Sequence, residues 1–283
     1  MQHTITTSAD GSSTLQLTQF REAYHSTNGA YTEATHIYIQ CGLEHLFRNC
    51  GAPQINIFDV GFGTGLNCIL AWAWQQQLRQ KGLPYPRIIY HGIEKYPIPL
   101  SEIEQLNYPD IIAQQTSLLP DNLSEVFHFM HKCQWEENVA VPGIPLSGNK
   151  SATECATNGN TSLPGEYCRE GDFILHKTCA DIAVLGTEYY RKACSREEKD
   201  SSGNSATATI PAVVFYDTFS PATQPELWDE AIFRNIAAGC ATGSVLVTYC
   251  SKGTVKQALR NAGFTLERLA GPPGKRHILR GTL

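Results

Sequence analysis

The stretch Asp59-Val60-Gly61-Phe62-Gly63-Thr64-Gly65-Leu66-Asn67 decides the fold of this 283-residue chain. It follows an apolar run, residues 55–58, and continues into a second one, residues 68–72. This order predicts a strand, a glycine-rich loop and a helix. Glycine lets the backbone come close to a ligand, and the start of a helix presents free N–H groups. We therefore expect a ligand site at this loop, with a tight structural turn as the alternative.

The spacing of the glycines narrows the class of ligand. A dinucleotide-binding loop follows G-x-G-x-x-G, but here Gly65 comes one residue early and Leu66 takes the position of the third glycine. An acidic residue followed by G-x-G-x-G is typical of S-adenosylmethionine-dependent methyltransferases. Glu94 ends the next apolar run, residues 87–93, where a carboxylate can accept hydrogen bonds from both ribose hydroxyl groups. A surface glutamate at a strand end is the alternative for Glu94, and the loop upstream favours the cofactor role.

Five sequence blocks occur in a fixed order between about residues 20 and 280. The longest reads Asp217-Thr218-Phe219-Ser220-Pro221-Ala222 and continues through Gln224-Pro225-Glu226-Leu227-Trp228. The others are Tyr24-His25-Ser26 with Gly29-Ala30 and Glu33, Asp59 to Asn67, Glu94-Lys95-Tyr96-Pro97, and Gly271-Pro272-Pro273-Gly274-Lys275-Arg276. Together these blocks resemble the MnmD family of methyltransferases, whose domain also forms the N-terminal half of the bifunctional enzyme MnmC. Thr218, Asp59 and Ala180 depart from the family pattern, and Thr218 could narrow the methyl-transfer site.

The resemblance implies an enzyme with a defined substrate. MnmD enzymes methylate the aminomethyl group of the tRNA wobble uridine. The implied reaction converts the 5-aminomethyl group of wobble (thio)uridine into 5-methylaminomethyl, with S-adenosyl-L-methionine as cofactor and tRNA as partner. The chain stops soon after residue 280, so we expect no flavin domain and a substrate made by other enzymes. Two alternatives stay open: a methyltransferase acting on a small-molecule amine, and a non-enzymatic relative that binds only the cofactor or RNA.

The predicted site residues fall into three groups. Asp217 is the catalytic candidate, because a carboxylate at the end of a parallel strand can orient an amine and take up its proton; capping the following turn is the alternative. The predicted cofactor-binding residues are Asp59, Gly61, Phe62, Gly63, Thr64, Gly65, Asn67, Glu94, Lys95 and Asp181. The predicted substrate-binding residues are Tyr24, Ser26, Glu33, Phe219, Lys252, Lys275 and Arg276.

Several of these residues have a second interpretation. Asp181 could accept a hydrogen bond from the adenine amino group, or it could equally cap a helix. Phe219 and Trp228 could stack on the uridine, although Trp228 fits better as a core residue. Only the resemblance suggests that residues 24–33 form a flap over the active site. His91 and His176 lie in predicted strands and are expected to be structural.

The fold follows from alternating strands and helices. The alternation predicts an α/β domain with a mostly parallel sheet covered on both faces. With the resemblance, it predicts a Rossmann-like class I methyltransferase of seven strands that ends in an antiparallel hairpin near residues 264–280. Residues 1–50 form an extension, with a β-hairpin around Asp10-Gly11 and a helix over 35–49. The methyltransferase domain spans 51–283, with surface insertions near 138–171 and 186–210, parts of which are too polar to form a core.

Composition and charge argue against several other classes of protein. The hydrophobic fraction of 42% is ordinary for a globular protein, and no apolar run approaches the ~20 residues of a membrane span. No signal peptide and no C-x-x-C pair occur, so we expect a cytoplasmic protein without a metal site. The net charge of −5 counts against a broad nucleic-acid binder. A local basic face could still meet tRNA phosphates; its candidates are Lys252, Lys256, Arg260, Arg268, Lys275, Arg276 and Arg280.

Overall fold

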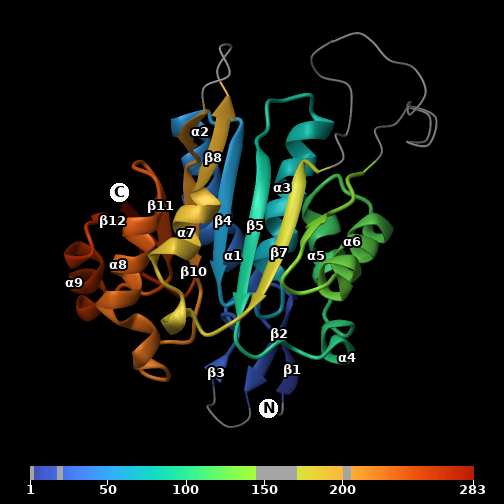
Figure 1. The fold of residues 1–283 in the computed structure, drawn as a ribbon. Coiled ribbons are helices and arrows are strands. Elements are labelled where there is room, and N and C mark those ends of the chain that lie inside the picture. Colours follow the sequence, from blue (N-terminus) through green and yellow to red (C-terminus); the bar gives the residue numbers. More distant parts are fainter. Residues whose placement is uncertain (1–2, 18–21, 145–170, 200–204) are drawn as a thin grey trace, which may run out of the picture.

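A central eight-stranded sheet organises the molecule (Figure 1). The computed structural model describes residues 3–17, 22–144, 171–199 and 205–283. The strand order is β12-β13-β11-β10-β4-β5-β7-β6. The parallel strands are β4 (Gln54–Val60), β5 (Arg87–Glu94), β7 (Phe173–Cys179), β10 (Ala212–Tyr216) and β11 (Val245–Thr248). The chain order reverses between β4 and β10, and ligands of such sheets bind beyond the carboxyl ends of the strands at this point.

The two edges of the sheet are antiparallel. β13 (His277–Thr282) pairs with β11 and with β12 (Thr265–Ala270), which confirms the expected C-terminal hairpin. At the other edge, β6 (Asn138–Ala140) pairs with β7 and adds an eighth strand to the seven that the sequence predicts. A strand of three residues is too short to show an alternating pattern, so the sequence did not predict it.

Helices cover both faces of the sheet. Alternate residues of β4 point to opposite sides, so that Ile55 and Ile57 join one apolar cluster and Phe58 and Val60 join the other. The first cluster packs under α3 (Leu66–Gln80), α5 (Tyr108–Gln115) and α6 (Pro120–Lys132). The second packs under α7 (Thr187–Cys194), α8 (Glu230–Gly239) and α9 (Gly253–Asn261). The strand and the helix predicted on either side of the glycine loop are β4 and α3, and β5 ends at Glu94 as predicted.

The N-terminal strands lie beyond the carboxyl ends of the parallel strands (Figure 1). β1 (His3–Thr7) and β2 (Ser13–Leu17) form the expected hairpin, and β3 (Glu22–Ala23) adds a short third strand. The expected helix is longer than predicted: α1 (Ala30–Ala34) continues through the π-helical η1 (Thr35–Glu44) into α2 (His45–Cys50). The helix α4 (Leu100–Ile103) and the 3-10 turns η3 (Ile182–Val184) and η4 (Pro225–Trp228) complete the loops near the site.

The predicted surface insertions need correction at their ends. Helix α7, inside the predicted insertion 186–210, belongs to the core, because Tyr190 is fully buried and Asn56 donates a hydrogen bond to Ala193 O at 3.1 Å. Beyond it, β8 (Ser195–Lys199) and β9 (Ser205–Thr209) form an antiparallel pair. The insertion 138–171 begins with β6, and Val141 and Ile144 are buried. Its residues 145–170 lie outside the described part of the chain.

Candidate active site

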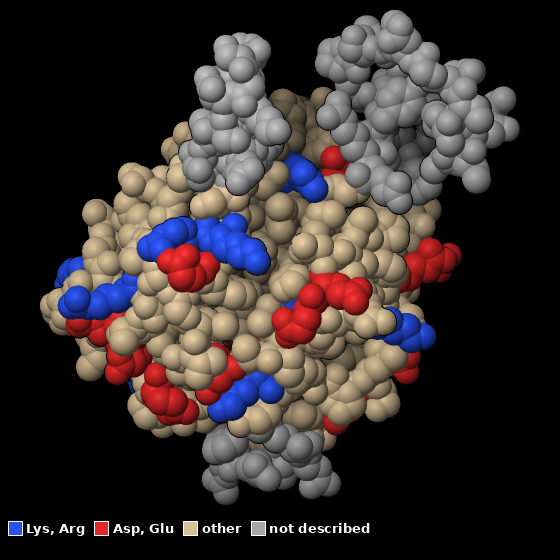
Figure 2. All heavy atoms as spheres, in the orientation of Figure 1, with Lys and Arg blue, Asp and Glu red and all other residues tan. Residues whose placement is uncertain are grey.

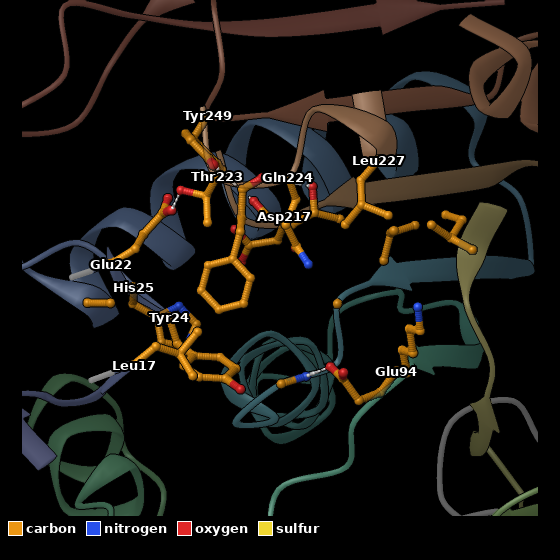
Figure 3. A pocket seen from close by; sticks show the side chains of 18 of the residues that line it. Leu17, Glu22, Tyr24, His25, Glu94, Asp217, Thr223, Gln224, Leu227 and Tyr249 are labelled. Carbon is orange, nitrogen blue, oxygen red and sulfur yellow. Dashed lines mark hydrogen bonds between the residues drawn. The ribbon is translucent and has the colours of Figure 1, made fainter. Parts of the chain in front are cut away.

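A cavity of about 470 Å³ lies at the carboxyl ends of the parallel strands, within the ~300–1,000 Å³ of ordinary small-molecule sites. Figure 3 shows Asp217 and Glu94 on its strand side and Tyr24 and His25 on the N-terminal side. The predicted site residues that line the cavity are Asp217, Gly61, Gly63, Glu94, Lys95, Asp181, Tyr24, Ser26, Glu33, Phe219 and Lys275. The structure thus brings together residues from both ends of the chain.

The glycine loop needs its glycines for two reasons. Gly61 and Gly63 have φ angles of +93° and +47°, which L side chains rarely adopt. A Cβ on Gly61 would lie 2.9 Å from the carbonyl oxygen of Asp217, and one on Gly63 would lie 3.1 Å from Tyr24 Cδ1. The loop therefore sits between the end of β10 and the N-terminal segment, with no room for a side chain on either side.

Glu94 ends β5 beside this loop. Its Oε2 accepts a hydrogen bond from Gly63 N at 3.0 Å, as Figure 3 shows, and its Oε1 accepts one from Tyr96 N at 2.9 Å. Each carboxylate oxygen has a second lone pair, so both can still accept a ligand hydroxyl group.

Lys95 and Asp181 meet at the rim of the cavity. Lys95 Nζ lies 2.8 Å from Asp181 Oδ2, and this bond lowers the pKa of the Asp181 carboxyl. Asp181 Oδ1 also accepts a hydrogen bond from Ala183 N at 2.9 Å and caps η3. The capping interpretation of Asp181 is therefore observed, and the same residue still lines the cavity.

Asp217 follows directly after β10, is partly buried and lines the cavity. Burial raises the pKa of its carboxyl, and nearby Tyr38, Asn67 and Lys275 act in the opposite direction. Asn67 Nδ2 donates a hydrogen bond to Asp217 Oδ2 at 2.9 Å. The hydroxyl group of Tyr38 is buried close to Asp217 without an aligned hydrogen-bond partner.

Five predicted cofactor residues do not line this cavity: Asp59, Phe62, Thr64, Gly65 and Asn67. Asp59 is fully enclosed, accepts a hydrogen bond from the Tyr90 hydroxyl at 2.6 Å, and has a pKa raised well above its usual range by burial. Phe62 packs against His131. Asp59 precedes the loop, Phe62, Thr64 and Gly65 lie within it, and Asn67 follows it, so closeness in sequence to the loop did not place these residues in the cavity wall.

Two predicted substrate residues, Lys252 and Arg276, also lie outside the cavity lining. Lys252 stands at the N-terminus of α9, and Arg276 precedes β13. Lys275 differs from both, because its Nζ donates to Glu33 Oε2 at 2.5 Å and lies 4.9 Å from the centre of the Tyr249 ring. Arg280, another basic candidate, pairs with Glu267 at 2.6 Å.

The N-terminal side contains residues that the sequence did not predict as site residues. His25 Nε2 lies 2.7 Å from Thr64 Oγ1, and burial lowers the pKa of this histidine to about 4, so it is neutral at pH 7. Glu22 accepts a hydrogen bond from Ser220 N at 3.0 Å. His25 belongs to the Tyr24-His25-Ser26 block, which is the only feature of the sequence that could have identified it.

Aromatic residues complete the substrate side. The rings of Tyr24 and Phe219 meet edge to face at 5.1 Å between centroids. Trp228 is 6% exposed, donates from Nε1 to Phe219 O at 2.9 Å, and packs against Tyr216. It is therefore a core residue that supports the Phe219 loop.

The fold and the site define the class. A family model described as S-adenosyl-L-methionine-dependent methyltransferase matches residues 205–283. The crystal structure of MNMC2 from Aquifex aeolicus has the same fold, with a TM-score of 0.63 and 20% sequence identity. The superposition covers all of the present chain and 70% of the MNMC2 chain. In the described residues, no helix has the length and apolarity of a membrane span, and no cluster of three or more His, Cys, Asp or Glu could hold a metal ion.

Relatives identify the branch within this class. The chain is 26% identical over 267 residues to the tRNA 5-methylaminomethyl-2-thiouridine biosynthesis bifunctional protein MnmC of Delftia acidovorans, and 27% identical to that of Azoarcus sp.. These matches cover 92% and 93% of the chain but only 32% and 33% of the relatives, so the chain spans about a third of their length. The chain is thus similar, over nearly its whole length, to about a third of each MnmC protein. The predicted family, fold class and cofactor are confirmed.

Proposed function

We propose that the chain is an N-methyltransferase that converts the 5-aminomethyl group of wobble (thio)uridine in tRNA into 5-methylaminomethyl. The main support for this proposal is the position of Asp217, a partly buried carboxylate in the cavity wall beside the glycine loop. Lys275, a cation that influences Asp217, is hydrogen-bonded to Glu33 instead. Asp217 is thus available to a cationic or amine ligand. The MnmC relatives, named for 5-methylaminomethyl-2-thiouridine biosynthesis, support an amine on tRNA as that ligand.

The strand side of the cavity fits S-adenosylmethionine. Gly61 and Gly63 bring the backbone of the loop to the cavity wall in a conformation that L side chains rarely adopt, and both oxygens of Glu94 keep lone pairs for ribose hydroxyl groups. Asp181 at the rim would accept a hydrogen bond from an amino group such as that of adenine. When bound, the cofactor supplies the methyl group on its sulfonium sulfur.

Asp217 prepares the nucleophile. An aliphatic amine with a pKa near ~10 is mostly protonated at pH 7 and must be neutral to attack. The carboxylate of Asp217 attracts the amine, aligns its nitrogen and accepts the proton released by methylation. Because burial raises the pKa of Asp217, its carboxylate is a better proton acceptor than an exposed one. Positioned acid–base groups of this kind contribute roughly 10²–10⁴-fold to a rate.

The N-terminal side would hold the nucleobase. Tyr24 and Phe219 offer aromatic surfaces on which an extruded base can stack. Glu33 and Lys275 offer one acceptor and one donor group within the same wall. A small-molecule amine would need no such wall, so stacking surfaces here favour the tRNA substrate.

If the wobble uridine enters the cavity, the rest of the tRNA must contact the protein surface around the mouth of the cavity. On the face drawn in Figure 2, basic and acidic side chains are intermixed, in keeping with the net charge of −5. We propose that Lys252 and Arg276, which lie outside the cavity lining, contact phosphates near the opening. The proposed location of the enzyme is the cytoplasm, where tRNA is modified.

Nucleoside analysis of tRNA from cells with and without the gene tests this function. Loss of the gene should remove 5-methylaminomethyl nucleosides and leave the 5-aminomethyl form in their place. The wild-type gene should restore them, and Asp217→Asn expressed at the same level should not. Unchanged 5-methylaminomethyl content in the deletion strain would contradict the proposal, and an effect on small amines alone would favour the alternative substrate.

A further inference from the structure

Asn67 closes the glycine-loop block, yet its side chain points away from the cavity. It is the second residue of α3 and is 3% exposed. Its Nδ2 lies 2.9 Å from Asp217 Oδ2 and 3.4 Å from Asp59 Oδ1. One amide group thus stands between two carboxyl groups, one lining the cavity and one fully buried.

The orientation of this amide follows from its surroundings. An ionised carboxylate only accepts hydrogen bonds, so the NH₂ group must face it. The opposite orientation would place the amide oxygen against two carboxyl oxygens. Asn67 Oδ1 is buried without a hydrogen-bond partner, which shows that the contacts of this side chain are concentrated on its NH₂ group.

Asp59 is already held by a different donor. The Tyr90 hydroxyl lies 2.6 Å from Asp59 Oδ2, and the enclosed carboxyl has no access to the cavity. Asp217 Oδ2 accepts a hydrogen bond from Asn67 Nδ2 at 2.9 Å. The Tyr38 hydroxyl group lies close to the same carboxyl group without an aligned hydrogen bond, so the amide of Asn67 is the well-oriented donor.

We propose that Asn67 is a positioning residue for Asp217, and that it fixes the rotation of this carboxylate toward the acceptor amine. The inference rests on the proposed function for its catalytic consequence, but its contact with Asp217 can be tested without a substrate. It assigns Asn67 a role different from the cofactor binding expected from its place in the loop.

The charged and titratable groups around Asp217 come from several elements. Those whose charge influences Asp217, or is influenced by it, are Tyr38 on η1, Asp59 on β4, Tyr90 on β5, Glu33 on α1, Tyr108 on α5, Tyr249 after β11 and Lys275 before β13. A substitution at Asn67 leaves all of these groups in place, although Asp59 loses its long 3.4 Å contact with the amide. A change in the titration of Asp217 then reports the lost amide contact.

The test compares Asn67→Ala with Gln75→Ala. Gln75 is also a buried amide on α3, but it donates to Pro86 O at 2.8 Å and Asp172 O at 3.0 Å, away from Asp217. Carbon-detected NMR titration of aspartate carboxyls, with Asp217 assigned from its loss in Asp217→Asn, measures the pKa of Asp217 directly. Calorimetry with S-adenosylmethionine checks that each variant folds and binds the cofactor.

In Asn67→Ala, the pKa of Asp217 should rise by about one, because a donated hydrogen bond stabilises the ionised form. Gln75→Ala should leave it unchanged, and both variants should keep cofactor affinity. The single-turnover methylation rate should fall by roughly tenfold in Asn67→Ala. In a plot of this rate against pH, the rise on the acidic side should move to higher pH. An unchanged pKa of Asp217 in Asn67→Ala, or in Asn67→Ser if Ala does not fold, overturns the inference. A raised pKa in an enzyme that methylates no tRNA would contradict the proposed function instead.

Discussion

The cavity has two walls that are built in different ways. The strand-end wall (Gly61, Gly63, Glu94 and Asp217) is fixed by backbone hydrogen bonds, such as Gly61 N and Phe62 N to Ile93 O at 3.0 Å. The N-terminal wall (Glu22, Tyr24, His25 and Glu33) is joined to the rest of the molecule largely by side-chain contacts, such as His25 to Thr64 and Glu33 to Lys275. The sheet thus sets the geometry of the strand-end wall, where we propose that the cofactor binds, while separate long-range contacts hold the N-terminal wall. Changes in the two walls should have separable effects.

The largest effect is expected at Gly63. Gly63→Ala introduces a Cβ at φ +47° and 3.1 Å from Tyr24, and it should lower cofactor affinity by at least about tenfold. Gly82→Ala is the matched control, because Gly82 has φ +64° but faces open space. Both variants carry a backbone strain of about 1–3 kcal/mol. Calorimetry showing equal S-adenosylmethionine affinity in the two variants would remove the glycine loop from the cofactor site.

Asp217→Asn should reduce the single-turnover methylation rate by roughly 10²–10⁴-fold while cofactor affinity stays unchanged. It removes the proton acceptor and keeps the shape of the side chain. Rate measurements from pH 6 to 9 check this expectation, and equal rates across that range would make Asp217 a structural residue.

The same substitution makes a prediction about stability. Because burial raises the pKa of Asp217 in the folded state, the ionised carboxylate costs stability as the pH rises above its usual value of 3.8. Asp217→Asn should therefore melt at a higher temperature than wild type at pH 8, and the difference should shrink toward pH 4. A melting temperature that falls at pH 8 would show that other interactions of the carboxylate outweigh its burial.

Lys275 tests the N-terminal wall. Lys275→Met leaves Glu33 without its ammonium partner, and we expect a loss of roughly 1–3 kcal/mol in the free energy of unfolding, toward the lower end because Lys275 is partly exposed. Burial raises the pKa of Glu33, so the loss should be largest at neutral pH and vanish below pH 4.5, where Glu33 is protonated in both states. Arg276→Met is the control, and an equal loss in both variants would show that the pair adds nothing specific.

The smallest effect concerns the surface cations. Lys252→Gln and Arg276→Gln should weaken tRNA binding and flatten its salt dependence by about one unit of slope for each lost phosphate contact. Cofactor affinity should not change. Parallel salt dependences for wild type and the double variant would move the tRNA surface away from these residues.

Much of the fold could be predicted because its signals are local. The glycine pattern with flanking apolar runs determined β4, the loop and α3, and the ending of β5 at Glu94 followed from the same reasoning. Helix α7 was missed because its sequence is polar apart from a few residues, such as Tyr190 and Cys194, whose burial depends on the sheet beneath them. Strand β6 was missed because three residues are too few to show the alternation of apolar and polar side chains that marks a strand.

The site was predicted in part. Position along the chain predicted that Gly61, Gly63, Glu94 and Asp217 would lie together, because the ends of parallel strands meet at one edge, and all four line the cavity. Position could not show which neighbouring side chains reach the cavity, so Asp59 and Asn67 were predicted to bind the cofactor although neither lines it. Tyr38 was missed because only the packing of η1 on the sheet brings it to Asp217.

Methyl transfer to a defined tRNA tests the central claim most directly. Purified protein is mixed with S-adenosylmethionine carrying a labelled methyl group and with tRNA that bears a 5-aminomethyl group on its wobble uridine. A matched tRNA without this group and a set of small primary amines serve as competing acceptors. We expect labelled 5-methylaminomethyluridine from the first tRNA alone, and almost none with Asp217→Asn. Label on the small amines, or no label on the aminomethyl tRNA despite cofactor binding, would contradict it.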